Sequence, residues 1–181
     1  MLTAPYDRGA EHSRDRPCPT QAAIALGSNL GHSAQILLQA LAVLDAEPDL
    51  QVLARSSLYQ TRPVGPPQPD YLNACAVLET NQGPLDLLQT LLRVEQQFGR
   101  VRRERWGPRL LDLDLLLYGD RILSLPQLEI PHPRMVDRAF VLVPLAEIAP
   151  HWREPRSGRT IADLTQQLDC SGVVPHHLAL F

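Results

Sequence analysis

The sequence predicts an α+β domain in which helices pack on one antiparallel β-sheet. Segments with strand-like and helix-like patterns follow one another in the order β-α-β-β-α-β, and extra C-terminal elements come after them. The two helical segments repeat apolar residues every three to four positions. The chain has 181 residues and is 44% hydrophobic, which is enough for one sizeable core. This order is that of the ferredoxin-like fold, with its helices on one face of the sheet.

The first half of the chain begins with a short apolar strand at 22–26, followed by the Gly-Ser-Asn-Leu-Gly segment at 27–31. This segment lacks the glycine spacing and the lysine of a phosphate-binding loop, so we interpret it as a tight strand-to-helix turn. Apolar residues at helical spacing then predict a helix at 33–46. A strand at 50–59 follows. The proline-rich segment 61–70 excludes a helix or an inner strand there.

The second half of the predicted sheet begins with a strand at 71–79, whose residues alternate in character. Pro84 stands at the start of the second helix, where proline is favoured. The helix ends near Phe98, and Gly99 is suited to cap it. A dense apolar run then predicts a strand at 110–118.

Shorter elements are expected after this strand. They are two strands at 121–123 and 128–130, a helix at 136–148 that Pro144 interrupts, and a weak helix at 161–168.

The domain organisation predicted from these patterns is simple. Residues 1–20 hold several charges and prolines without apolar periodicity, which is typical of a disordered tail. A single domain is expected at 21–169, and 170–181 is expected to be a second tail. No internal repeat or dividing linker is visible.

Composition excludes several classes of protein. All 17 basic residues are arginines, so P-loop kinases and protein kinases, which need a lysine, are excluded. The three cysteines form no C-x-x-C motif, so neither a zinc site nor a disulfide framework is indicated. No apolar run approaches the ~20 residues of a membrane span, and no secretory signal is evident. The net charge of -3 disfavours nucleic acid as a partner. We therefore expect a cytoplasmic monomer.

Two acidic residues lie within the predicted strand 110–118. Asp112 and Asp114 are two positions apart, so their side chains point to the same face, and the leucines around them take the buried face. Paired carboxylates repel each other unless a cation lies between them. Mg²⁺ suits such a pair, because it takes one or two carboxylates and completes its shell with water and phosphate oxygens.

An arginine cluster directly precedes this acidic pair. Its five members are Arg100, Arg102, Arg103, Arg105 and Arg109. A guanidinium can bond two phosphate oxygens at once, so the cluster suits a nucleotide triphosphate. An isolated arginine cluster is more often a solvated loop. Joined to the acidic pair by the Trp-Gly-Pro turn at 106–108, it predicts a metal–triphosphate site.

Other residues suit a flat heterocyclic ligand. Tyr71 and Asn73 share one face of their predicted strand, and Phe140 lies in the third helical segment. Tyr71 and Phe140 are also compatible with ordinary core packing, whereas a buried amide such as Asn73 needs hydrogen-bonding partners. His132, held between two prolines, and Arg138 could reach phosphate or could be surface residues.

Several motifs carry a resemblance to a known family. They are ALGSNLG at 25–31, Y-x-T-x-P-x-G-P and P-D-Y-L-N within 59–73, V-E-x-x-x-G-R-x-R at 94–102, R-W-G-P-R-x-x-D-x-D at 105–114, and P-H-P-R-M at 131–135, followed by Arg138 and Phe140. From about Ala22 to Ile148 the chain resembles the hydroxymethyl-dihydropterin pyrophosphokinases of folate biosynthesis. The resemblance implies transfer of diphosphate from ATP to the hydroxymethyl oxygen of the reduced pterin, with release of AMP.

The resemblance also implies roles at the nucleotide end of the site. Asp112 and Asp114 would hold two Mg²⁺ ions that bridge the ATP phosphates. The phosphates would be contacted by Arg100, Arg102, Arg109, His132 and Arg138. Arg102 and Arg109 would stabilise the charge that develops during transfer. Arg102 would lie on a loop that closes over the substrate, and Trp106 would move with that loop. Glu95 and the main chain near Leu115 would lie close to the nucleotide.

At the pterin end, the resemblance implies that Tyr71 and Phe140 sandwich the ring. Asn73 and main-chain groups near Thr61 and Val64 would read its edge. Two positions depart from some relatives: Leu92 replaces a glutamine near the adenine, and Arg62 replaces a proline next to the pterin.

Two functions from other classes remain open at this point. A nucleotidyltransferase could use the same acidic pair to transfer AMP rather than diphosphate. An RNA-binding module could use a ferredoxin-like sheet with aromatic residues on its strands, although the net charge is negative and no run of such aromatics is present.

Overall fold

The structure is a computed structural model that describes residues 19–63, 67–99 and 107–176. Its main sheet has six strands in the order β5-β1-β4-β3-β8, and β2 pairs with β4 next to β3. The strands are β1 (Thr20–Ser28), β2 (Leu50–Arg55), β3 (Tyr59–Thr61), β4 (Tyr71–Thr80), β5 (Asp112–Tyr118) and β8 (Val173–Pro175). All the strand pairs described in this sheet are antiparallel, as the sequence predicts.

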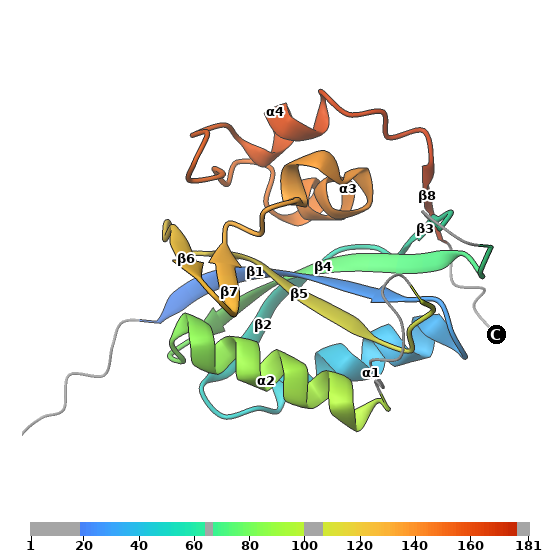
Figure 1. The fold of residues 1–181 in the computed structure, drawn as a ribbon, viewed down its shortest axis with the longest axis horizontal. Helices are drawn as coiled ribbons and strands as arrows, with labels where there is room; N and C mark the ends of the chain where they lie inside the picture. Colours follow the sequence, from blue (N-terminus) through green and yellow to red (C-terminus); the bar gives the residue numbers. More distant parts are fainter. Residues whose placement is uncertain (1–18, 64–66, 100–106, 177–181) are drawn as a thin grey trace, which may run out of the picture.

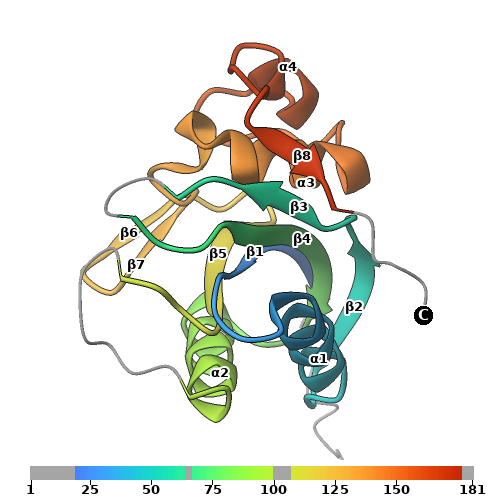
Figure 2. The ribbon, with the colours of Figure 1, turned by 90° about the vertical axis from the view of Figure 1, so that its right-hand side faces the viewer.

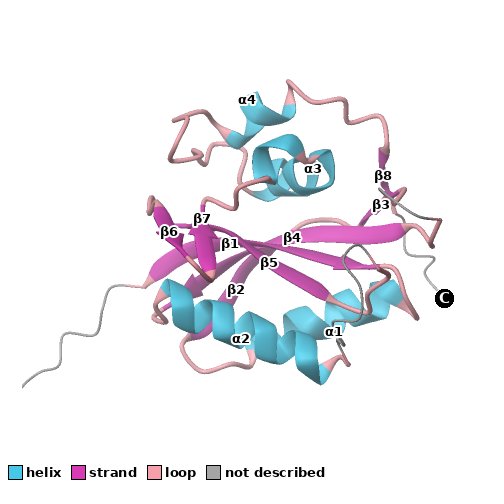
Figure 3. Cartoon of the chain, in the orientation of Figure 1, coloured by secondary structure: helices cyan, strands magenta, loops and turns pink. Residues whose placement is uncertain are grey.

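Helices cover both faces of the sheet (Figures 1 and 3). Helices α1 (Ser33–Asp45) and α2 (Pro84–Gln97) lie on one face, and α3 (Ala139–Ile148) and the short α4 (Ile161–Thr165) lie on the other. The expectation that helices occupy one face therefore holds for α1 and α2 only. The physical reason is that β4 is buried on both faces, and such a strand needs apolar cover on each side.

Alternate residues of β1 face two separate cores. Ala22, Ile24 and Leu26 belong to the core beneath α1 and α2, whereas Ala23 packs in the core beneath α3 and α4. All four side chains are at most 1% exposed. The main sheet is thus the central layer of three, and its strands bring residues to both sides.

The predicted strand 50–59 is wrong in one respect, because the chain forms two strands there. Residues 56–58 stand opposite only residues 74 and 75 of β4, so the ladder between β2 and β3 is interrupted. Ser56 bridges the gap: its N–H donates to the carbonyl of Cys75, and its Oγ accepts from the Cys75 N–H, both at 2.9 Å. The segment 56–58 has one residue more than the two residues of β4 opposite it. The alternation of residues along the sequence does not indicate this extra residue.

The boundaries of α2 follow the predicted signals. Pro84 occupies the first turn, and Gly99 follows the helix with a positive φ of 79°, which glycine adopts at little cost.

In the third helical segment the predicted break at Pro144 is wrong, because Pro144 lies inside α3. The chain breaks instead at Arg138, whose backbone is extended between a 3₁₀ turn at Met135–Asp137 and α3.

A strand also forms within 170–181, which the sequence patterns give as a tail. Residues Val173–Pro175 form β8 and pair with β3, and the His176 N–H donates to the carbonyl of Leu58 at 2.8 Å. Figure 2 shows β8 alongside β3. Three residues are too few for alternation to identify a strand.

The second, small sheet pairs β6 (Leu123–Leu125) with β7 (Leu128–Ile130), so the first of these strands starts later than predicted.

Among the described helices, none has both the length and the apolar character that crossing a membrane requires.

Candidate active site

A cavity of about 490 Å³ gathers most of the described candidate residues on the α3 side of the main sheet. Its walls come from the C-terminal end of β1, the starts of β4 and β5, and the segment from His132 to Val141. Nine candidate residues line it: Thr61, Tyr71, Asn73, Arg109, Asp112, Asp114, His132, Arg138 and Phe140. Candidate residues up to 79 positions apart in the sequence, Thr61 and Phe140, therefore meet in one place.

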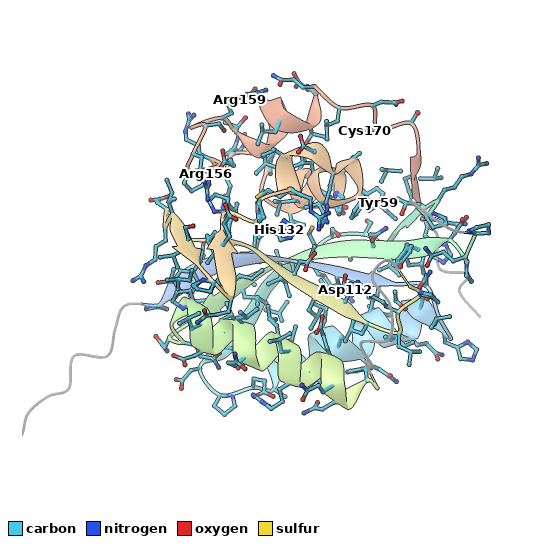
Figure 4. All side chains as sticks on the ribbon, in the orientation of Figure 1. Tyr59, Asp112, His132, Arg156, Arg159 and Cys170 are labelled. Atoms are coloured by element: carbon cyan, nitrogen blue, oxygen red, sulfur yellow. The ribbon has the colours of Figure 1, made fainter. Side chains whose placement is uncertain are left out.

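The acidic pair enters this cavity from β5. Asp112 and Asp114 both line it, while Leu113 and Leu115 on the alternate positions are buried in the core beneath α1 and α2. Figure 4 shows Asp112 on β5, below the loop that carries His132. Asp112 Oδ2 accepts from Arg109 Nη1 at 2.7 Å, and the Arg138 Nη1 lies 3.4 Å from Asp114 Oδ2. Each carboxylate thus has an arginine within ion-pair distance.

A β-bulge in β5 positions His132 beside the acidic pair. Ala23 pairs with Leu117 and Ile24 with Leu115, so Leu116 is the extra residue in the ladder. The carbonyl of Leu116 accepts a hydrogen bond of 2.9 Å from the His132 N–H. The bulge therefore anchors the loop after β7 against the strand that carries the carboxylates.

The hydrogen bonds of His132 define its tautomer. Its Nδ1 accepts from the Arg134 N–H at 3.2 Å, so the ring proton of the neutral form lies on Nε2, which is 3.8 Å from Asp114 Oδ2. Burial lowers the pKa of His132 below its ordinary value of 6.5, although Asp114 acts in the opposite direction. At neutral pH His132 thus offers a neutral N–H donor to the cavity.

The other end of the cavity is lined by aromatic and amide side chains. Tyr71 and Asn73 project from β4, and Phe140 lies at the start of α3. Asn73 is 6% exposed, and its Nδ2 donates to Thr61 Oγ1 at 2.7 Å, which fixes the orientation of the amide. The Arg138 guanidinium lies over the Phe140 ring, 5.6 Å from its centroid. Burial raises the pKa of Tyr71, so its hydroxyl stays protonated at neutral pH.

Two candidate residues do not line this cavity. Glu95 of α2 is 1% exposed, and its carboxylate accepts from the Leu113 N–H at 2.7 Å. Leu115 is buried beneath α1 and α2, although its strand β5 is the outermost of the main sheet. Their nucleotide contacts stay predictions. Two positions differ from some members of the family that the sequence resembles. Arg62 lines the cavity, whereas Leu92 lies on α2 away from it.

Four further candidates lie outside the described residues, so their places in the site stay predictions. They are Val64, Arg100, Arg102 and Trp106.

Some residues line the cavity although the sequence patterns did not single them out. Gly27 is paired in register with Asn73 on β4 and with Asp112 on β5, so it lies between the two halves of the site. Gln68 and Arg134 also line the cavity. The strand register could have revealed Gly27, because a small residue is needed between two inward-pointing neighbours. Gln68 lies in a proline-rich loop, where no periodicity marks it.

Comparisons with known proteins identify the family of the chain. A family model described as 7,8-dihydro-6-hydroxymethylpterin-pyrophosphokinase (HPPK) matches residues 23–150. The chain is 54% identical over 154 residues to the 2-amino-4-hydroxy-6-hydroxymethyldihydropteridine pyrophosphokinase of Synechocystis, covering 85% of this chain and 79% of that protein. It is 46% identical over 151 residues to the protein of the same name from Pseudomonas aeruginosa, covering 83% and 93%.

Solved structures support the fold. The Plasmodium falciparum HPPK-DHPS, in a triple mutant crystallised with SDX-DHP, matches with a TM-score of 0.67 and 16% identity over 86% of this chain. This chain spans 45% of that longer protein, so the likeness concerns one part of it. The family model matches well over half of the chain, and the curated relatives align along most of their own length. This chain therefore belongs to the 7,8-dihydro-6-hydroxymethylpterin-pyrophosphokinase family.

Proposed function

We propose that this chain transfers diphosphate from ATP to the hydroxymethyl group of 6-hydroxymethyl-7,8-dihydropterin, with release of AMP, in folate biosynthesis. The observation that carries the proposal is the composition of one cavity. It combines two carboxylates and two arginines at one end with a tyrosine, a phenylalanine and a buried amide at the other. The first set suits a metal–phosphate group, and the second suits a flat heterocycle with polar edges.

The pterin would lie between Tyr71 and Phe140. The two rings come from β4 and α3, on either side of the cavity, and offer apolar faces to a stacked ligand. Asn73 can read the pterin edge, because Thr61 already fixes which way its amide points. Arg62, which directly follows β3, also lines the cavity. Main-chain groups near Thr61 and Val64 would complete the contacts to the pterin edge.

The phosphates of ATP would lie at the acidic end. Arg109 and Arg138 provide permanent positive charge there, and the neutral His132 provides a hydrogen-bond donor. Arg100 and Arg102 would add further phosphate contacts from the preceding loop. Arg102 and Arg109 would stabilise the negative charge as the bond between the β-phosphorus and the α–β bridging oxygen breaks.

The acidic pair fits magnesium by its donor chemistry. Asp112 and Asp114 offer hard oxygen ligands on one face of β5, and no group of three or more His, Cys, Asp or Glu side chains among the described residues forms a complete metal cage. Two carboxylates are what a magnesium ion needs when phosphate oxygens and water complete its shell. Two Mg²⁺ ions held there would neutralise phosphate charge and orient the triphosphate.

What the residues of the chain do in the transfer is mostly positioning. The stacked pterin presents its hydroxymethyl oxygen toward the arginine end, so that a new bond to the β-phosphorus forms as AMP leaves. Tyr71 stays protonated, and the Asn73 amide has no basic nitrogen, so neither is suited to act as a base. Closure of the segment that carries Arg102 would keep water from the triphosphate.

The proposal is tested by product analysis. The chain is incubated with ATP and the reduced hydroxymethylpterin, with and without Mg²⁺, and the products are separated by chromatography. We expect AMP and a pterin diphosphate in equal amounts, and only when Mg²⁺ is present. Transfer of AMP to the pterin would favour a nucleotidyltransferase instead.

We further expect a cytoplasmic monomer whose partners are these two small molecules, with neither nucleic acid nor membrane among them. Gel filtration would check the monomer.

A further inference from the structure

Asn29 joins two loops that border the substrate cavity. It lies in the turn after β1 and is 3% exposed, yet it does not line the cavity itself. Its N–H donates to the carbonyl of Arg109 at 3.0 Å, and its Oδ1 accepts from the Arg109 N–H at 2.8 Å. These two bonds tie the turn after β1 to the segment that leads into the acidic strand.

The amide nitrogen of the same side chain binds the other loop. Asn29 Nδ2 donates to Gln68 Oε1 at 3.0 Å and to the carbonyl of Pro69 at 3.1 Å. The Gln68 oxygen also lies 3.4 Å from the hydroxyl of Tyr71, at long hydrogen-bond distance. Through Gln68, Asn29 is therefore connected to an aromatic residue of the pterin end.

This pattern differs from that of an ordinary turn asparagine. Such a residue bonds its own backbone a few positions along the chain. All three side-chain bonds of Asn29 instead reach partners at least 39 positions away. A buried amide that is fully used in this way fixes the distance between its partners, because any shift would leave a polar group unpaired.

We propose that Asn29 is a positioning residue that holds the Arg109 segment and the loop 67–70 in one fixed arrangement, so that the phosphate end and the pterin end of the cavity stay aligned. This inference rests on the proposed assignment of those two ends to ATP and to the reduced pterin. Asn29 touches neither substrate; it acts through Arg109, Gln68 and Pro69.

The two functions of the side chain can be separated by substitution. Asn29→Asp keeps an oxygen that can accept from the Arg109 N–H but replaces the donor by a second acceptor. The Gln68 amide can turn over to answer this change, whereas the Pro69 carbonyl cannot become a donor. Asn29→Asp therefore removes the bond to the Pro69 carbonyl and selectively weakens the link to the loop 67–70. Asn29→Ala removes both links.

The test measures the two ends of the cavity separately. Calorimetry gives the affinities for the reduced hydroxymethylpterin and for α,β-methylene-ATP with Mg²⁺, and steady-state assays give kcat and KM. For Asn29→Asp we expect pterin affinity to fall about tenfold while the affinity for the ATP analogue stays within about threefold. For Asn29→Ala we expect both affinities to fall and kcat to fall as well. Asn81→Asp and Asn81→Ala, at an exposed asparagine in the turn after β4, are matched controls expected to behave as wild type.

Gln68→Ala removes one arm of the link without touching the buried turn, and it serves if the Asn29 variants fold poorly. We expect it to weaken pterin binding, and we expect the double variant with Asn29→Asp to be less than additive. Additive effects, or affinities within twofold of wild type in all three single variants, would overturn the inference. A wild-type chain that binds both ligands but yields no pterin diphosphate would overturn the proposed function while leaving this binding test intact.

Discussion

At the scale of single residues, Gly27 shows why the cavity has room for a ring. It is paired in register with Asn73 and Asp112, and it contributes no side chain to the wall between them. A Cβ at this position would lie 3.3 Å from Asn73 Oδ1 and 4.0 Å from Tyr71 Cδ1. The glycine therefore leaves open the space in which the amide and the aromatic ring would meet the pterin.

The Gly27→Ala variant should lose pterin affinity more than stability. The added methyl group crowds Asn73, which cannot move freely because Thr61 holds its amide. We expect pterin affinity to fall by roughly tenfold, the equivalent of about one lost hydrogen bond, with unchanged affinity for α,β-methylene-ATP. Calorimetry on both ligands checks this. An equal loss for both ligands would argue for a general distortion of β1.

Asp114→Ala should remove most activity and leave the fold intact. The substitution removes a like charge beside Asp112 but also the ion pair with Arg138, so we expect the two effects to offset each other and the fold to stay intact. If Asp114 holds magnesium, kcat should fall by at least about a hundredfold. Turnover is measured at saturating Mg²⁺, with Asp120→Ala, at an exposed aspartate in the turn after β5, as the control. Normal turnover of Asp114→Ala would remove this residue from the metal site.

At the scale of elements, β8 supports the pterin end from outside. It pairs with all three residues of β3, including Thr61, whose hydroxyl accepts from Asn73. Without β8, β3 would become an edge of the sheet and its main chain would lose partners on one side. The short C-terminal strand is therefore connected, through β3, to the proposed pterin end of the cavity.

A chain that ends at Gly172 should bind the pterin several-fold more weakly and melt at a lower temperature. Its affinity for the ATP analogue should change little, because β5 lies at the opposite edge of the sheet. A chain that ends at His176 keeps β8 and its bond to Leu58, and it serves as the control. If both truncated chains bind the pterin equally well, β8 has no part in holding Thr61.

At the scale of the whole molecule, α3 and α4 form the second helical layer, and the segment between them contains a turn. The carboxylate of Glu154 holds this turn by hydrogen bonds. Burial alone would raise the pKa of this carboxyl, but hydrogen bonds from Ser157 and Arg156 outweigh burial and lower it. The carboxylate accepts from the Arg156 N–H at 2.9 Å and from the Ser157 N–H at 2.7 Å. A lowered pKa in the folded state means that the ionised form favours folding.

Glu154→Gln should therefore lower Tm by a few degrees at neutral pH. The contribution of Glu154 is complete above its ordinary pKa of 4.5 and is lost as pH falls through the lower value of the folded state. Thermal melts of both chains from pH 7 down to pH 3 should show the difference in Tm shrinking below pH 4.5. A difference that is the same at every pH would mean that shape, and not charge, explains the effect.

Local patterns predicted much of this molecule, and non-local contacts explain the rest. The spacing of Asp112 and Asp114 within β5 placed them on one face, because residues two apart on a strand point the same way. The break between β2 and β3 depends on how Ser56 pairs with Cys75, and β8 depends on an edge offered by β3. Neither partner is near in sequence, so neither feature leaves a periodic signal.

The same reasoning applies to the site. Residues with distinctive chemistry, such as the paired aspartates and Asn73, could be singled out as candidates from their types and spacing, and they line one cavity. Asn29 could not, because the role we propose for it depends on partners 39 and 80 positions away. The coverage of both faces of the sheet was missed for a related reason: the second layer comes from α3 and α4, which lie outside the β-α-β-β-α-β core pattern.

The ion pairs of Asp112 and Asp114 also bear on how a divalent ion and a nucleotide would bind together. Arg109 contacts Asp112, and Arg138 contacts Asp114, so a divalent ion held by this pair, as we propose, would compete with the guanidiniums for the carboxylate oxygens. Triphosphate oxygens offer those guanidiniums a new partner at the moment when the carboxylates take the ion. Under the proposed function, cation and nucleotide would bind by such an exchange of partners, and each should raise the affinity of the other by the same factor.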